Sequence, residues 1–327
     1  RLREARREKD LSIRILGLEE ARALRFNSEV ESYLPPAPLV KGIMELCPRV
    51  SELVPYIDWR FFFHEWGIDA SSALDAEAKK LKEEGLAMLS RMGTELPLSP
   101  AGLCAILPAA SRGDDILLYS DESRSKPVAI LPCLRQQRVK EDRSPQLCLS
   151  DYITAEGSLP DWLGLFAVTA GGAEEALAKL EAAGDDFGAI MFKILCDRLA
   201  EAFAEKMHEE VRKRIWGDAP DESLSPEELS SGQYRGIRPA PGYPACPDHR
   251  DKAAIMRLLG AEERIGMSLT ESFMMLPSAS VSGFYFSHPS SRYFAVGRVG
   301  SDQLADYAAR RGESPEAAER AVKEALG

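Results

Sequence analysis

The sequence predicts an α+β fold, with a mainly antiparallel sheet built from hairpins and long helices packed around it. Segments with strand composition occur in pairs joined by short polar turns, as in hairpins. Long segments of helical composition are set between these pairs, which argues against a doubly wound parallel sheet. No internal repeat or low-complexity tract interrupts the order.

The first forty residues are expected to lead into the folded body. The chain begins with Arg1 rather than Met, so we expect a processed or excised piece of a longer protein. Residues 31–48 are rich in proline, which fixes φ and removes backbone donors, and this predicts an extended connector. We therefore expect a linker over residues 1–38 and one folded domain over residues 39–327.

The first half of that domain combines an aromatic block, a helix and several strands. Residues 54–66 form the aromatic block, which fits either a buried strand or a helix. Residues 75–91 are rich in Ala, Leu, Lys and Glu and predict a helix. The predicted strands are a hairpin of residues 116–121 with 128–134, and two further short strands at residues 147–153 and 163–171.

The second half is mainly helical, with one more predicted hairpin. The clearest helix covers residues 187–216. Asp185 or Asp186 can cap its first turn, and Gly217 can end it. A capping box at Ser225 predicts a short helix. The other expected elements are helices at 174–183 and 252–260, a hairpin of 281–287 with 292–299, and two final helices starting at Ser301 and Ser314.

Composition argues against several classes of partner. The net charge of −11 disfavours a nucleic acid, because binding to a phosphate backbone requires a basic surface. No apolar run reaches the roughly 18 residues of a membrane span, and the charged first residues lack the apolar stretch of a secretory signal, so we expect a cytoplasmic protein. The six cysteines form no C-x-x-C pair and only four histidines are present, so we expect no metal site.

The common motifs of enzymes are also missing. The sequence contains no P-loop, no G-x-S-x-G and no G-x-G-x-x-G that follows a strand. No candidate base or nucleophile stands out, so we predict no catalytic residue in this chain.

A proline-rich loop at residues 236–249 is the most distinctive feature of the sequence. Prolines restrict its backbone, so the remaining N–H and C=O groups of Ala240, Gly242 and Tyr243 can be held in place to meet the edge of an adenine base. Arg238 can grip a carboxylate through two hydrogen bonds. Composition alone favours the alternative, a loop that crosses the surface with Arg238 in an internal salt bridge.

A resemblance to a known family reverses this preference. Residues 234–247 are similar to the S-adenosylmethionine-binding signature of cobalamin-dependent methionine synthases, and the likeness covers the chain from about residue 31 onward. The chain thus resembles the reactivation domain at the C-terminus of those enzymes. Further similar segments are residues 56–59, 114–116, 197–203, 269–272, 280–283 and 287–289.

The resemblance implies a set of ligand contacts. S-adenosylmethionine carries a carboxylate, an ammonium, a sulfonium, a ribose and an adenine. Its site therefore requires a cation, carboxylates or aromatic faces, and small or flat groups. The positions that match the family's contacts supply each type, and they are Asp58, Glu201, Arg238, Ala240, Tyr243, Tyr293 and Phe294.

Several of these residues also have structural explanations. Asp58 can cap a helix, and Glu201 can face water with acidic neighbours one turn away. Tyr293 and Phe294 alternate in a predicted strand, so one of them should point into the core. Two departures from the family pattern are present: Phe294 stands where a second tyrosine is common, and the region after Trp66 is short and lacks the lysine and proline often found there.

The resemblance also implies a mechanism. Cobalamin is bound by a partner domain of the same enzyme, and the reactivation domain presents S-adenosylmethionine during reductive methylation of inactive cob(II)alamin. Flavodoxin or an equivalent reductant supplies the electron. Orientation and exclusion of water are then the roles of this chain. It lacks a D-x-H-x-x-G motif and clustered cysteines, so we expect no synthesis of methionine from it alone.

Other functions remain open at this point. One alternative is a module that senses S-adenosylmethionine or caps a corrinoid protein in another pathway. An independent methyltransferase is a third hypothesis, and it would need an acceptor site. The basic residues Arg212, Lys213 and Arg214 can be interpreted as a docking patch for flavodoxin, but basic residues in the last turn of a helix are commonly explained by the helix dipole.

Overall fold

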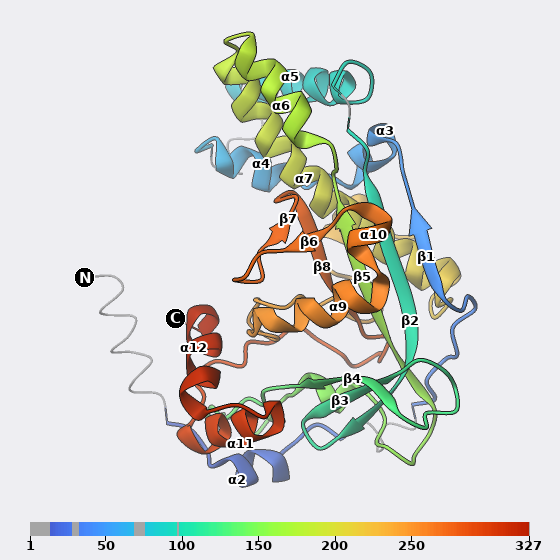
Figure 1. The fold of residues 1–327 in the computed structure, drawn as a ribbon, viewed down its shortest axis with the longest axis vertical. Coiled ribbons are helices and arrows are strands. Elements are labelled where there is room, and N and C mark those ends of the chain that lie inside the picture. Colours follow the sequence, from blue (N-terminus) through green and yellow to red (C-terminus); the bar gives the residue numbers. More distant parts are fainter. Residues whose placement is uncertain (1–13, 28–32, 69–75, 97, 327) are drawn as a thin grey trace.

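An antiparallel sheet of six strands forms the centre of the protein (Figure 1). The computed structural model describes residues 14–27, 33–68, 76–96 and 98–326. The strand order is β4-β3-β2-β5-β8, with β1 paired to the first half of β2, and every pairing is antiparallel. This arrangement confirms the predicted α+β class. The strands are β1 (Ile43–Leu46), β2 (Ala101–Arg112), β3 (Asp115–Tyr119), β4 (Pro127–Pro132), β5 (Asp161–Thr169) and β8 (Ser280–Tyr285), with a separate pair β6 (Ser268–Leu269) and β7 (Met275–Leu276).

The two central strands are buried on both faces. Successive side chains of a strand point to opposite sides of the sheet, so Cys104 and Phe166 enter one hydrophobic core while Leu103 and Leu165 enter another. Every residue of β5 is buried. The sheet therefore requires helices on both faces, which is why its central strands read as continuous apolar runs.

Helices from the first two thirds of the chain cover one face. The long helix α7 packs against β5 and β8, and shorter helices pack against α7. The side chain of Asp185 caps α7 by accepting the N–H of Gly188 at 2.8 Å, as predicted. A π-helical turn follows α7 and runs to Ile215, and Gly217 then takes a positive φ. The helices of this layer are α3 (Val50–Leu53), α4 (Trp59–Glu65), α5 (Ala76–Met92), α6 (Ala173–Ala182) and α7 (Asp186–Glu210).

The remaining helices lie on the other face or at the ends of the sheet, except α8 (Pro226–Ser230), which lies near α7. α9 and α10 pack on β2 and β5, and α11 lies against β4 (Figure 1). The predicted capping box is present: Ser225 accepts the N–H of Glu228 at 3.2 Å, and α8 follows. These helices are α2 (Leu18–Ala23), α8 (Pro226–Ser230), α9 (Lys252–Leu259), α10 (Ala261–Ile265), α11 (Ser301–Arg311) and α12 (Pro315–Leu326).

Local signals predicted most of these elements. The hairpin of β3 with β4 is confirmed, as are the helices that correspond to α5, α6, α7, α9, α11 and α12. The aromatic block at residues 54–66, which fitted a strand or a helix, folds mainly as α4. No helix in the described part of the chain is long and apolar enough to cross a membrane.

The strand predicted at residues 147–153 is wrong, because this segment contains a 3₁₀ turn at Leu149–Tyr152. The turn brings the carboxylate of Asp151 to the guanidinium of Arg135 at 2.7 Å, and both side chains are almost fully buried. Asp151 also accepts the N–H of Cys148 at 3.0 Å. A buried charge requires such partners, and an extended strand would point Asp151 elsewhere.

The second predicted hairpin is also wrong. β8 forms as expected, but it pairs with β5, while residues 292–299 form no strand. This segment lies instead against the proline-rich loop, where the N–H of Val296 donates to the carbonyl of Pro244 at 2.8 Å. The backbone groups of these two segments therefore form hydrogen bonds with distant parts of the chain, and not with each other as a hairpin would require.

The described part of the expected linker lies on the folded body. In α2, Arg22 pairs with Asp114 and with Asp306, each at 2.9 Å. The indole N–H of Trp216 donates to the carbonyl of Pro36 at 2.9 Å. Residues 1–13 and 28–32 of the expected linker lie outside the described residues.

Candidate functional site

One face of α7 and of the turn that follows it carries a row of polar side chains. Glu201, Glu205, His208 and Arg212 recur at helical spacing, so they lie on the same side of the helix. Glu201 is exposed, whereas the other three are buried. Buried charged groups require partners of opposite charge. The proline-rich loop supplies such a partner for Glu205, namely Arg238.

The loop at residues 236–249 is fastened just beyond the end of β8. Ile237 and Phe286 exchange two backbone hydrogen bonds, each 3.0 Å long. Gly236 permits this approach, because its φ is +80° and a Cβ there would overlap the carbonyl oxygen of Phe286. The loop is therefore held by hydrogen bonds as well as by its prolines.

A hydrogen-bonded turn occupies the middle of the loop. The N–H of Tyr243 donates to the carbonyl of Ala240 at 3.1 Å, and the N–H of Gly242 donates to the carbonyl of Cys246 at 2.7 Å. Both N–H groups are therefore already hydrogen bonded within the turn, and the contact of this backbone with an adenine edge stays a prediction. A stiff turn here requires internal hydrogen bonds, which use the donors that a ligand would need.

Arg238 forms an ion pair with Glu205. Its Nη2 donates to Oε2 of Glu205 at 2.6 Å, and both side chains are largely buried. Burial opposes the charge of Arg238, but Glu205 and nearby tyrosine hydroxyls raise the pKa of the guanidinium above its ordinary value. Burial raises the pKa of Glu205, although Arg238 opposes that shift. The internal salt bridge that composition favoured is thus present, and the same guanidinium also lines a pocket.

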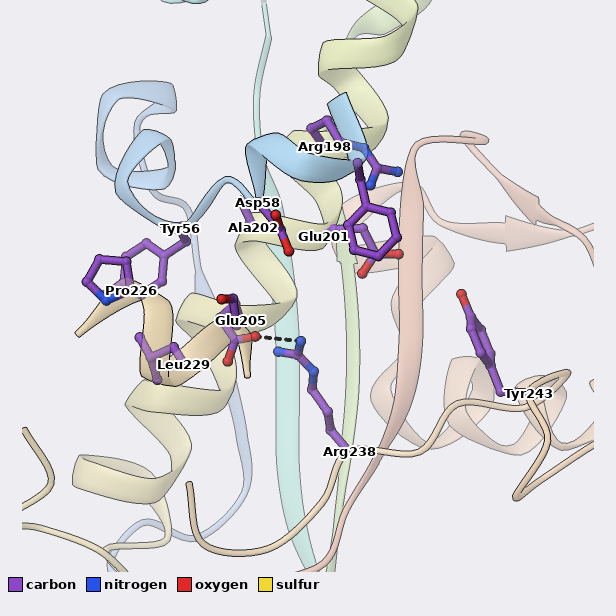
Figure 2. Close-up of a pocket in the computed structure, with 12 residues that line it drawn as sticks. Tyr56, Asp58, Arg198, Glu201, Ala202, Glu205, Pro226, Leu229, Arg238 and Tyr243 are labelled. Atoms are coloured by element: carbon purple, nitrogen blue, oxygen red, sulfur yellow. Dashed lines mark hydrogen bonds and ion pairs between the residues drawn. The ribbon is translucent and has the colours of Figure 1, made fainter. Parts of the chain in front are cut away.

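The pocket beside this ion pair has a volume of about 410 Å³ and lies between α4, α7, α8 and the loop (Figure 2). Figure 2 shows Arg238 pointing from the loop toward Glu205, with Leu229 of α8 on one side of the pair and Tyr243 on the other. The residues that line it are Tyr56, Asp58, Phe61, Arg198, Glu201, Ala202, Glu205, Pro226, Leu229, Ser230, Arg238 and Tyr243.

The structure brings four of the residues proposed from the sequence together at this pocket, namely Asp58, Glu201, Arg238 and Tyr243. Asp58 also caps α4, because its carboxylate accepts the N–H of Arg60 at 3.0 Å and pairs with that side chain. The cap expected as a structural explanation is therefore confirmed, and the same residue lines the pocket. Glu201 is exposed, as expected if its side chain faces water.

The other three, Ala240, Tyr293 and Phe294, are not among the lining residues. The hydroxyl of Tyr293 accepts the backbone N–H of Arg238 at 3.0 Å and lies 3.1 Å from the hydroxyl of Tyr234. Phe294 packs between the second core and a cluster near the C-terminus. One member of the pair thus enters the core as expected, although the segment is not a strand.

Sequence reasoning missed several side chains of the pocket, among them Tyr56, Phe61, Arg198 and Glu205. Glu205 had a signal, because it lies one helical turn from Glu201. No signal in the sequence marked the aromatic side chains as part of the pocket, because the pattern of residues 54–66 does not reveal which aromatic groups are buried. Only the packing of α4 on α7 decides that.

His208 is a buried neutral group beneath the site. Burial lowers the pKa of its imidazole well below the ordinary value, and the charges of Arg212 and Arg238 act in the same direction. The ring stacks on Tyr285, with centroids 4.9 Å apart and an interplanar angle of 8°. His208 therefore packs as a flat uncharged ring.

The basic residues near the end of α7 are paired with glutamates. The pair of Arg212 with Glu222 is almost fully buried, so it offers no charge to a partner. These pairs explain the cluster more directly than the helix dipole does. They are Arg212–Glu222 at 2.6 Å, Lys213–Glu209 at 3.2 Å and Arg214–Glu210 at 3.1 Å.

In the described part of the chain, cysteine and histidine side chains form no cluster that could hold a metal ion. All six cysteines are free thiols. Among the described residues, no group of three or more His, Cys, Asp or Glu side chains is arranged to hold a metal ion.

Comparison with known proteins agrees with this geometry. Residues 49–312 match the family described as vitamin B12 dependent methionine synthase, activation domain. Among solved structures, the chain is similar to the MetH reactivation domain bound to AdoHcy, with a TM-score of 0.91 and 44% sequence identity. That match covers 96% of this chain and 99% of the other. The chain therefore belongs to the family of vitamin B12 dependent methionine synthase activation domains.

Proposed function

We propose that this chain binds S-adenosylmethionine (AdoMet) in the pocket between α4, α7, α8 and the loop at residues 236–249. It would there present the methyl group to cobalamin held by a partner domain of methionine synthase, a methyltransferase. The observation that carries the proposal is the convergence of Asp58, Glu201, Arg238 and Tyr243 on one pocket in a member of this family. AdoHcy, bound by the solved relative, is AdoMet without its transferable methyl group.

The charges of the pocket suit the charged groups of AdoMet. Arg238 donates through Nη2 to Glu205, which leaves its other donors for a carboxylate. Asp58 and Glu201 supply negative charge for the ammonium and the sulfonium. Opposite charges in a partly enclosed pocket attract more strongly than in bulk water, because water screens them less.

Ala240, Tyr293 and Phe294 remain part of the proposed set of contacts. Tyr293 has the best support, because its hydroxyl is hydrogen bonded to the backbone of Arg238 and its side chain is 53% exposed. Ala240 lies in the same turn as Tyr243 and is small enough to permit close approach of a ligand.

The role of this chain would be to bind and orient the methyl donor and to exclude water from it. Cobalamin supplies the nucleophile that accepts the methyl group, so the chain needs no base or nucleophile of its own. Flavodoxin or an equivalent reductant, the cytoplasm as the setting, and residues 1–38 as a linker from the cobalamin-binding domain belong to the same proposal. They come from the resemblance of the sequence to the family.

A reconstitution assay tests this function. The chain is mixed with a cobalamin-bearing fragment in the oxidised state, reduced flavodoxin and AdoMet, and the visible absorption of the cobalamin is followed. Transfer of the methyl group is expected, and leaving out any one component should stop it. The yield should rise when the two proteins are joined through residues 1–38, because a tether raises the effective concentration.

Titration calorimetry with AdoMet and AdoHcy provides the matching binding measurement. Binding without methyl transfer, even in the joined protein, would favour a sensing or capping module instead. Absence of binding would contradict the proposed function altogether.

A further inference from the structure

Tyr234 lies outside the pocket but is joined to Arg238 by two successive hydrogen bonds. Its hydroxyl lies 3.1 Å from the hydroxyl of Tyr293, which in turn accepts the backbone N–H of Arg238 at 3.0 Å. Tyr234 precedes the proline-rich loop by two residues and is not among the side chains that line the pocket. The start of the loop is therefore connected to Arg238 through a side chain of a distant segment, residues 292–299, as well as along the chain.

The ring of Tyr234 is held by α7 and by the π-helical turn that follows it. It meets the imidazole of His208 edge to face, with centroids 4.7 Å apart and an interplanar angle of 80°. The guanidinium of Arg212 lies 4.5 Å from the centroid of the Tyr234 ring, within the range of a cation–π contact. Both supporting side chains are almost fully buried, and Arg212 is fixed by its ion pair with Glu222. The ring of Tyr234 is therefore anchored to a well-packed part of the fold.

Tyr293 depends on such an anchor. Its side chain is 53% exposed, so it loses conformational freedom when it is held in one orientation. The hydrogen bond to Tyr234 selects the orientation in which the hydroxyl of Tyr293 meets the backbone N–H of Arg238.

Arg238 is consequently fixed at both ends. Figure 2 shows its guanidinium directed at Glu205 on α7, where the ion pair holds it, while Tyr293 holds its backbone N–H. The ion pair alone would leave the backbone of the loop free to shift, because several rotatable bonds separate the guanidinium from the backbone. A displacement of about 1 Å is enough to weaken a directed contact with a ligand.

We propose that Tyr234 is a positioning residue of the ligand site. Its hydroxyl holds Tyr293 in the orientation that accepts the N–H of Arg238, and so keeps Arg238 aligned with the carboxylate of the ligand. This inference rests on the proposed function, since it assumes that Arg238 binds that carboxylate. Tyr234 itself does not touch the ligand, and its hydroxyl carries the role while its ring provides the anchor.

Tyr234→Phe tests the hydroxyl alone, because a phenyl ring keeps the contacts with His208 and Arg212. Titration calorimetry with AdoHcy should show binding weakened by about threefold to tenfold, the range for loss of one hydrogen bond. The midpoint of thermal unfolding should be unchanged, since the lost hydrogen bond is exposed to solvent. Tyr33→Phe is the matched control and should bind AdoHcy as wild type does, because it also removes a hydroxyl bonded to another hydroxyl, that of Ser287 at 2.8 Å.

Two further measurements separate positioning from a general effect on the fold. In a Tyr293→Phe background, Tyr234→Phe should cause no further loss of affinity, because the hydroxyl that it positions is already missing. 5′-Methylthioadenosine keeps the adenosine of AdoHcy and lacks its carboxylate. Competition with this ligand should therefore show wild-type affinity in Tyr234→Phe, as in Arg238→Lys.

Three outcomes overturn the positioning role. They are wild-type affinity for AdoHcy in Tyr234→Phe, equal losses for AdoHcy and 5′-methylthioadenosine, and additive losses in the double variant with Tyr293→Phe. Each leaves the proposed function intact, provided that the wild type binds AdoHcy. Failure of the wild type to bind AdoHcy overturns the proposed function, and the positioning role with it.

Discussion

Arg238 combines a structural and a binding role in one side chain. Its ion pair with Glu205 is largely buried, so the guanidinium stays in place whether or not a ligand is present. The planar fork of arginine can donate to Glu205 and to a second carboxylate at the same time. Lysine has one charged nitrogen and cannot reproduce that geometry.

We therefore expect Arg238→Lys and Arg238→Ala to weaken the binding of AdoMet by about tenfold to a hundredfold, the range for loss of a charged hydrogen bond. Titration calorimetry measures the effect. Arg235→Lys is the control from just before the loop, because Arg235 donates to the carbonyl of Ser287 and does not line the pocket. Wild-type affinity in both Arg238 variants would make Arg238 purely structural.

At the scale of elements, the proline-rich loop depends on contact with the end of β8. Prolines limit its conformations, but the two hydrogen bonds between Ile237 and Phe286 set its distance from the sheet. Gly236 makes this contact possible, because glycine adopts a positive φ without strain and has no Cβ that would overlap Phe286. The position of Arg238, two residues later, depends on the same contact.

Gly236→Ala should destabilise the protein by roughly 2 kcal/mol or more, because it adds a steric overlap to the strain of a positive φ. It should also weaken the binding of AdoHcy, since the loop must shift. Gly232→Ala is a matched control, with a φ of +73° but open space around the added Cβ, and should lose only about 1 kcal/mol. Urea unfolding compares the two, and equal losses would show that the contact with Phe286 does not matter.

At the scale of the whole molecule, the described N-terminal segment is tied to the far end of the sheet from α7. Arg22 links α2 to Asp114, just before β3, and to Asp306 of α11. Asp114 is also paired with the buried Arg135 at 2.6 Å. These ion pairs join segments from the start, middle and end of the chain, none of which lines the pocket.

Arg22→Ala should lower the free energy of unfolding by about 1–3 kcal/mol, because Arg22 has partners that are partly or fully buried while it is itself only partly exposed. Binding of AdoHcy should not change. Arg25→Ala is the control, since Arg25 is exposed on the neighbouring turn. Unchanged stability of Arg22→Ala in urea would mean that the ion pairs of α2 contribute little to the stability of the folded domain.

The sequence by itself determined the features that depend on neighbouring residues. The caps at Asp185 and Ser225, the end of the long helix at Gly217 and the hairpin of β3 with β4 all rest on contacts within a few residues. The signature at residues 234–247 identified the family, because its unusual composition is specific without any knowledge of contacts.

Only the tertiary structure decided which distant groups meet. Residues 147–153 read as a strand, but Asp151 must reach the buried Arg135, and a charge in the interior outweighs local propensity. β8 forms backbone hydrogen bonds with β5 and with the proline-rich loop, and not with the segment that follows it in the chain. The same holds for the candidate site: Glu205 and Phe61 join the pocket through the packing of α4 and the loop on α7, and such long-range contacts leave no mark in local composition.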